Sequence, residues 1–218
     1  MVGAIRREGL GIGHREAKQA RQRRSIVGVA AALLREQALE AVTVREIAAR
    51  ADISEATFFN YFGSKESVLC EWAEALVDDA FERAAASEDR VLRRAMRGVC
   101  RDVAEAVAAD LALARLAFRR VPACADARRA SPPRGWRPAA GADRLIERAQ
   151  ARDEVRADWP AVHLAGLLRV AVVHGVAAAL AEPSVETTRE IAARLGPTAD
   201  LVLDGFRKRH ERVRAATP

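Results

Sequence analysis

The amino-acid sequence predicts an all-helical protein, and three observations carry this prediction. The 218 residues include 48 alanines but only ten aromatic residues, and helix formers outnumber Ile, Thr and Tyr. Apolar residues recur at helical spacing along most of the chain. The length suits one mid-sized domain, or a small domain joined to a larger one, that buries its core without a disulfide or metal. A β-sandwich or β-barrel is disfavoured.

The N-terminal end is the most cationic stretch of a chain whose net charge is +6. Residues 1–24 hold seven basic and two acidic residues, a net +5, which favours a polyanionic partner near this end. A solvated tail is the alternative interpretation. Residues 17–40 then predict a long helix, because apolar residues recur there at helical spacing: Ile26, Val29, Ala30, Leu33 and Leu34.

A short helix is expected next, beginning after Thr43 and running to about Ala51. Thr43 and Glu46 have the spacing of a capping box, in which each side chain accepts the other residue's backbone amide hydrogen. Val42 and Ile47 occupy the two positions of a hydrophobic staple around this cap.

A tight break at residues 52–54 separates this helix from another of about two turns. Ser54 is expected to cap the second helix, which ends at Phe62. Gly63 is then expected in the left-handed conformation that follows many helices. Ser64 caps a longer helix that reaches residues 84–86. Two short helices joined by a tight turn are therefore held between two longer ones.

The rest of the chain also has helical periodicity. Helices are predicted over residues 91–110, 142–152, 160–181 and 185–208. A shorter helix is predicted after residue 110, with Leu111, Leu113, Leu116 and Phe118. Residues 119–138 hold four prolines and six arginines and predict a loop. Gly196-Pro197 is expected to kink or split the last helix. The apolar stretch 162–180 contains Arg169, so it predicts a buried helix of a soluble protein rather than a membrane span.

The sequence carries no motif for catalysis or for a metal or cofactor. The three cysteines, Cys70, Cys100 and Cys124, are widely spaced and form no Cys/His cluster. We expect them to be reduced in a cytoplasmic protein, and the N-terminus lacks the apolar core of a secretory signal. A phosphate-binding glycine loop and a Ser/His/Asp order are both missing, so an enzyme is not predicted.

The short helix after Ser54 is the most informative segment. Four of the ten aromatic residues lie within residues 58–62, and Phe58 and Phe62, one turn apart, are expected to enter the core. The residues that then face largely away from the core are Glu55, Ala56, Phe59 and Asn60. In a major groove Thr57 has the chemistry to contact a thymine methyl group, and Asn60 to pair with adenine.

The segment from Thr43 to Leu69 (TVREIAARADISEATFFNYFGSKESVL) resembles the helix-turn-helix of the TetR (tetracycline-repressor) family of transcriptional regulators. The resemblance is dense over residues 20–70, whereas the remaining two-thirds resembles the family only in helicity and length. It implies a homodimeric repressor with an N-terminal three-helix DNA-binding head and a larger helical domain for effector binding and dimerisation. No cofactor is expected for the protein.

The resemblance also implies roles for individual residues. Base-facing positions fall on Glu55, Ala56, Thr57 and Asn60, and phosphate contacts on Thr43, Arg45, Tyr61 and Lys65. Ala56 stands where family members often have glycine, and Phe59 where they often have tyrosine. Phe59 lacks the hydroxyl that commonly bonds a phosphate there, and it is equally compatible with packing beneath the helix. Tyr61 offers a hydroxyl from another angle.

We therefore expect a basic arm over residues 1–14, a DNA-binding domain over 15–63, and a linking helix with the effector and dimer domain over 64–218. The last two long helices are expected to pair with their copies, so that two heads meet an inverted-repeat operator in double-stranded DNA. No membrane partner is expected. A small hydrophobic or amphipathic effector is expected against Met96, Val99, Val103, Leu116, Phe118, Trp136, His163 and His174.

Several alternatives remain open from the sequence alone. His163 and His174 share a helix face but lie about 16 Å apart along it, too far for one metal ion, so a core or interface position is the other interpretation. A ligand-independent or architectural DNA-binding protein of the same fold is the first rival function. A helical enzyme or binding protein with a vestigial head is the second. The sequence does not identify the effector or the target genes. It also leaves open repression versus activation, and the roles of the arm and the 119–138 loop.

Overall fold

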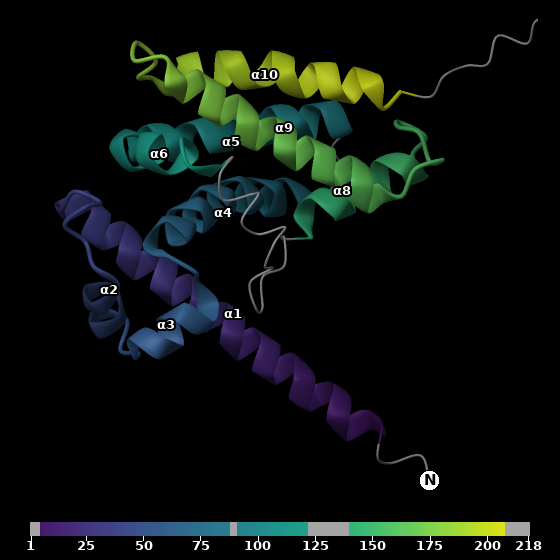
Figure 1. Cartoon of the computed structure of the whole chain (residues 1–218). Coiled ribbons are helices and arrows are strands. Elements are labelled where there is room, and N and C mark those ends of the chain that lie inside the picture. The colour runs from purple at the N-terminus through teal and green to yellow at the C-terminus, as the bar shows by residue number, and fades with distance from the viewer. Residues whose placement is uncertain (1–4, 88–90, 122–139, 208–218) are drawn as a thin grey trace, which may run out of the picture. The chain divides into compact units, whose positions relative to one another are not determined.

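The computed structural model describes residues 5–87, 91–121 and 140–207, and all regular secondary structure within these ranges is α-helical (Figure 1). The all-α prediction is confirmed. The helices are α1 (Ile5–Glu36), α2 (Val44–Arg50), α3 (Glu55–Tyr61), α4 (Lys65–Ala85), α5 (Leu92–Ala109), α6 (Leu111–Phe118), α8 (Gly141–Ala151), α9 (Ala161–Ala181) and α10 (Thr188–Gly205). Helix α6 contains the four apolar residues of the shorter helix that the sequence predicts after residue 110.

The chain divides into two compact units. Unit 1 comprises residues 1–75 and 109–138, and unit 2 comprises residues 76–108 and 139–218. Helix α4 is continuous across the division, so its first half belongs to unit 1 and its second half to unit 2. The domain boundaries expected from the sequence stay predictions.

In unit 1, helices α1, α2 and α3 lie together (Figure 1). Their inward-facing side chains form a small apolar core. Its fully buried side chains are those that the helical spacing and the staple predicted, among them Ile26, Leu33, Val42, Ile47 and Phe58. A seven-residue helix is not stable by itself in water. Helices α2 and α3 therefore depend on this core and on their caps.

The cap of α2 is only half of the predicted capping box. The Thr43 hydroxyl accepts the Glu46 amide hydrogen at 3.1 Å, as expected. The Glu46 carboxylate instead accepts from the side-chain amide of Gln37 at 2.9 Å. The physical reason is that α1 ends at Glu36, before the predicted residue 40, which places Gln37 in the following loop within reach of Glu46.

The turn between α2 and α3 uses an aspartate in a left-handed conformation. Asp52 has φ 53°, which aspartate tolerates better than most residues. The Asp52 amide donates to the Ala49 carbonyl at 3.3 Å, and the Ile53 amide donates to the Ala48 carbonyl at 3.0 Å. This pair of bonds is a Schellman motif, which satisfies the last carbonyls of α2 and fixes the angle at which α3 begins.

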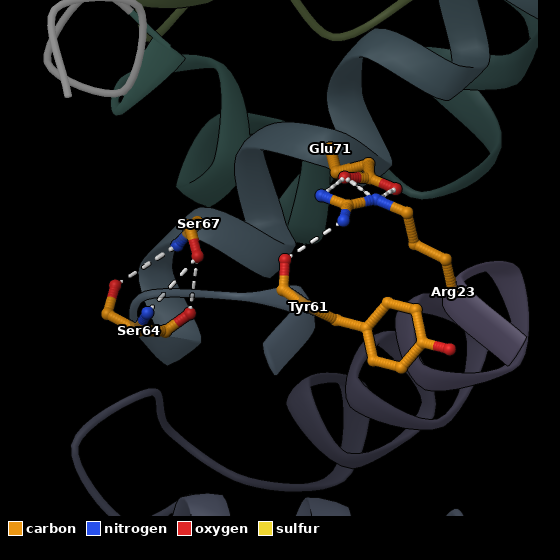
Figure 2. Close-up of polar contacts among 5 residues, drawn as sticks. All are labelled: Arg23, Tyr61, Ser64, Ser67 and Glu71. Carbon is orange, nitrogen blue, oxygen red and sulfur yellow. Dashed lines mark hydrogen bonds and ion pairs between the residues drawn. The ribbon is translucent and has the colours of Figure 1, made fainter. Parts of the chain in front are cut away.

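The left-handed conformation predicted for Gly63 is wrong. Its φ lies outside the left-handed region, and Phe62 before it is extended (φ −136°, ψ 134°). The chain thus passes straight from α3 into the cap of α4. There Ser64 and Ser67 bond reciprocally: each hydroxyl accepts the other's backbone amide, at 3.3 and 3.2 Å (Figure 2). The prediction that Ser64 caps this helix is therefore confirmed.

Unit 2 holds the second half of α4 with α5, α8, α9 and α10. Helix α9 packs along α8 and α10. At the start of α8, Gly141 lies so close to α4 that a Cβ atom there would be 2.6 Å from the Glu82 backbone nitrogen. Arg148 donates to the Ala85 carbonyl at 2.9 Å and so caps the end of α4. Pro197 lies inside α10, which continues through it, so the predicted split does not occur.

The cysteines differ from the expectation that all three are reduced. Cys70 is fully buried and disulfide-bonded, which contradicts that expectation. Cys100 is buried with a free thiol, and burial, aided by the charge of Asp200, raises its pKa to about 11. Cys124 lies outside the described residues.

By length and composition, one helix among the described residues is apolar enough to cross a membrane. It is α9, of which half of the most apolar window is buried in the protein. A buried core helix passes the same test, and Arg169 within α9 pairs with Asp78 of α4 at 2.7 Å, both side chains being largely buried.

Candidate nucleic-acid interface

Helix α3 presents to solvent the face that the sequence predicted. Phe58 is fully buried and its ring lies 5.6 Å from that of Phe62 in the core. Phe59 is 54% exposed, so it does not pack beneath the helix. Glu55, Ala56 and Asn60 are also exposed, and Thr57 and Tyr61 are partly exposed. Most of this short helix is therefore free of core contacts.

The N-terminus of α3 is fixed by its own side chains. The Ser54 hydroxyl accepts the Thr57 amide hydrogen at 3.0 Å, which confirms the predicted cap. The Ser54 and Thr57 hydroxyls also bond each other at 2.9 Å. The Thr57 hydroxyl thus already has one partner within the protein.

The flanking positions differ in how freely they meet solvent. Thr43 and Arg45, at the start of α2, are exposed. Lys65, at the start of α4, donates to the Leu39 carbonyl at 2.6 Å and to the Val42 carbonyl at 2.7 Å. An ammonium group has three donors, so two of those of Lys65 hold the loop between α1 and α2.

A buried arginine that the sequence analysis missed joins the helices of the head. Arg23 of α1 is 4% exposed, and its guanidinium donates to the Glu71 carboxylate of α4 at 2.6 and 2.7 Å. It also donates to the Tyr61 carbonyl at 2.9 Å (Figure 2). The guanidinium carbon lies 4.4 Å from the centre of the Phe62 ring. The sequence does contain an indication of this burial, because Arg23 lies three residues before Ile26 and therefore on the same, buried face of the helix.

The outer surface of α1 adds positive charge to the same unit. Lys18, Arg21 and Arg24 are exposed. Arg6 and Arg7 of the arm and Arg15 precede them, but the side chains of residues 1–16 lie outside the described residues. The one acidic side chain on the exposed face of α3 is Glu55.

The residues expected to bind an effector fall into several environments. Met96, Val99 and Val103 are buried in unit 2, and Phe118 is buried in unit 1. Leu116 lines a pocket of about 420 Å³ in unit 1, whose other walls include Leu34, Leu39, Asp110 and Leu113. Trp136 and nearly all of the 119–138 loop lie outside the described residues. The effector assignment stays a prediction.

The two α9 histidines are both exposed, so the interpretation of either as a core residue is wrong. His163 meets Trp159 edge to face, with ring centres 6.2 Å apart. Around them α9 exposes large apolar side chains that no described residue covers: Val162, Leu167 and Val170, each more than half exposed. No group of three or more potential metal ligands occurs in the described part of the chain.

Comparisons with known proteins agree with this geometry. Residues 26–71 match the family described as "Bacterial regulatory proteins, tetR family", which spans the end of α1 through the first turns of α4. None of the curated proteins compared with the chain matches it.

Solved structures share the fold over most of the chain. Thermus thermophilus FadR, a TetR-family transcriptional repressor solved with lauroyl-CoA, is 24% identical, with a TM-score of 0.59 over 90% of this chain and 98% of that one. SmeT, the repressor of a Stenotrophomonas maltophilia multidrug efflux pump, is 21% identical, with a TM-score of 0.50 over 90% and 95%. A TetR-family regulator from Shewanella sp. PV-4 is 18% identical, with a TM-score of 0.52 over 86% and 99%.

These likenesses confirm the TetR-family resemblance. The class defined by the local geometry is a helix-turn-helix fold, formed by α2, the turn after it and α3. More particularly, the chain has the TetR-family regulator fold, with a helix-turn-helix head at its N-terminus and a larger helical region after it.

Proposed function

We propose that this protein is a homodimeric transcriptional repressor of the cytoplasm that binds an inverted-repeat operator and leaves it when a small hydrophobic or amphipathic molecule binds. The observation that carries the proposal is the solvent-facing surface of α3. A seven-residue helix held by a cap on one side and a core on the other exposes a small alanine, an amide and a carboxylate. That surface fits a major groove at close range.

In this proposal the side chains of α3 contact bases, and residues at the start of α2, the end of α3 and the start of α4 contact phosphates. Glu55, Ala56, Thr57 and Asn60 face base edges. Thr43 and Arg45 meet phosphates at the exposed start of α2. Tyr61 and Lys65 complete the phosphate contacts, Lys65 with the one donor that the α1–α2 loop leaves free. Phe59 makes apolar contact with the DNA.

The exposed apolar face of α9 supports dimerisation. Val162, Leu167 and Val170 would be costly to leave in water, and a second copy of the chain would cover them. Two copies related by a two-fold axis place two α3 helices on half-sites about one turn of DNA apart, roughly 34 Å.

Effector control is proposed to pass along α4. The helix has no internal glycine or proline, and it belongs to unit 1 up to residue 75 and to unit 2 beyond it. Lauroyl-CoA in the Thermus relative is a long apolar chain on a polar carrier, which is the class of molecule proposed here. A complete reversal of DNA-binding competence needs about 5.5 kcal/mol of difference in ligand affinity between states.

The experiment that tests the function is selection of bound duplexes from random double-stranded DNA by the full-length protein. The expected result is an enriched inverted repeat, bound by two chains. Failure to enrich any sequence would contradict repression of a defined operator and would favour an architectural protein of the same fold.

A second experiment tests the α4 route. A Gly-Gly insertion after Ala75, at the division between the two units, is expected to keep the dimer and the operator affinity but to abolish release by a ligand found in a thermal-shift screen. Release to the wild-type extent would contradict the route.

The basic arm is proposed to bind phosphates. Deleting residues 1–14 is expected to weaken operator binding and to lower its salt dependence by about 0.9 in logarithmic slope for each phosphate that the arm neutralises. An unchanged slope would mean that the arm is a solvated tail.

A further inference from the structure

Helix α3, the recognition helix of the proposed function, lacks a left-handed residue at its C-terminal end. The helix ends at Tyr61 and the Phe62 amide bonds the Phe58 carbonyl, but Gly63 does not adopt the conformation that commonly satisfies the carbonyls after it. The group that reaches the Tyr61 carbonyl is the guanidinium of Arg23, at 2.9 Å. A cation at this end of a helix is also favoured by the helix dipole.

The same guanidinium is held from two other directions. It forms a forked ion pair with Glu71 of α4, and its carbon lies 4.4 Å above the ring of Phe62, the residue that ends α3. Figure 2 shows the guanidinium between the Glu71 carboxylate and the Tyr61 carbonyl. One side chain therefore joins α1, the end of α3 and α4, and the last turn of α3 carries two proposed DNA contacts, Asn60 and Tyr61.

From this geometry we propose that Arg23, oriented by Glu71, is a positioning residue that sets the angle of the recognition helix for sequence-specific DNA binding. The inference rests on the proposed function. It adds to that function a residue that touches no DNA and that determines how well the protein distinguishes its operator from other sequences.

The chemistry separates positioning from support of the fold. Replacing a buried ion pair with apolar side chains of similar volume is often neutral or stabilising, whereas removing one partner alone is strongly destabilising. Arg23→Met combined with Glu71→Leu is thus expected to keep the fold while removing the donor to the Tyr61 carbonyl. Arg23→Lys keeps the positive charge but loses the fork that reaches both partners.

The test measures the affinity of the full-length protein for two duplexes of equal length, the sequence enriched by the wild-type protein and a scrambled one. The double variant is expected to melt within a few degrees of wild type, to bind the scrambled duplex equally well, and to lose about tenfold in operator affinity. Arg23→Lys is expected to lose severalfold. Amide exchange at Phe62, whose NH bonds the Phe58 carbonyl, is expected to quicken in both.

A matched control is Arg35→Lys, because Arg35 pairs with Asp110 at 2.6 Å in the same unit but is half-exposed. Its hydrogen bonds and ion pair go to Asp110 and not to α3. Its operator preference is expected to stay at the wild-type value. Full operator preference in both Arg23 variants would overturn the positioning role. Equal weakening on both duplexes would overturn it too, because it would show only loss of fold. Failure of the wild-type protein to enrich any sequence would instead refute the proposed function.

Discussion

Helices α3 and α9 each have one face that no other described residue of the chain covers, and the two faces have opposite chemistry. The face of α3 combines an amide, a carboxylate, a small alanine and one aromatic ring. The face of α9 is built from Val162, Leu167 and Val170, with His163 and His174 among them. An uncovered face indicates a partner, and its chemistry indicates the class: the groups on α3 match base edges, whereas those on α9 match another apolar protein surface.

The largest effect is expected from placing charge on the α9 face. Leu167→Glu with Val170→Glu should prevent dimerisation, because the carboxylates would be buried without partners. Operator affinity should then fall by roughly 10²-fold or more, since each head must bind alone. Sedimentation and DNA titration measure the two effects. Val91→Glu, at a position that is 52% exposed elsewhere in unit 2, is the control and should remain dimeric. A dimer that survives the α9 substitutions would assign this face to another partner.

Substitutions on α3 should act on DNA binding without touching the dimer. Asn60→Ala and Thr57→Ala are each expected to cost about 1–3 kcal/mol of operator binding, with Thr57→Ala at the lower end because its hydroxyl already bonds Ser54. Fluorescence anisotropy measures the loss. If both variants bind the operator like wild type, the exposed face of α3 is not the base-contacting surface.

The smallest effects should separate the caps of a DNA-contacting helix and a structural helix. Ser54→Ala and Thr187→Ala each remove a cap and should cost about 1 kcal/mol of unfolding free energy. Only Ser54→Ala should also weaken operator binding, because α3 alone of the two helices faces DNA in this account. Equal DNA affinity in the two variants would show that the α3 cap has no role beyond stability.

The α10 cap also predicts a pH dependence. The Glu190 carboxylate accepts from the amides of Glu186 and Thr187 and from the Thr187 hydroxyl, which lowers its pKa. The unfolded chain therefore binds a proton there first as pH falls, so this contribution is present above about pH 4.3 and is lost progressively below it. Glu190→Gln should flatten that part of the acid-unfolding curve, and an unchanged curve would contradict the assignment.

Sequence alone predicted those parts of the head that depend on neighbouring residues. The caps at Thr43, Ser54 and Ser64 involve a residue three positions away, so a short pattern contains all the information. The wrong predictions depend on the backbone conformation of other segments. Glu46 bonds Gln37 because α1 ends before the predicted residue 40. Gly63 needs no left-handed conformation because Phe62 before it is extended.

The Arg23 contact shows the same limit over a longer range. Its partner Glu71 lies 48 residues along the chain, so no local pattern joins them. The helical period could have indicated only that Arg23 lies on the buried face of α1. In unit 2 the sequence predicted the helices but not which of their faces stay uncovered. The exposure of His163 and His174 follows from how α9 packs on α8 and α10, which periodicity in an almost wholly apolar helix does not reveal.

Helix α3 is proposed to contact bases while α9 joins two copies, and one measurement tests both proposals. Duplexes are selected from random DNA in parallel by the wild-type protein and by Asn60→Ala, and the base preferences are compared position by position. The account predicts an inverted repeat for the wild type, and for Asn60→Ala a loss of preference confined to one pair of positions related by the repeat's symmetry. Preferences that are unchanged, or lost at a single position without a symmetric counterpart, would contradict it.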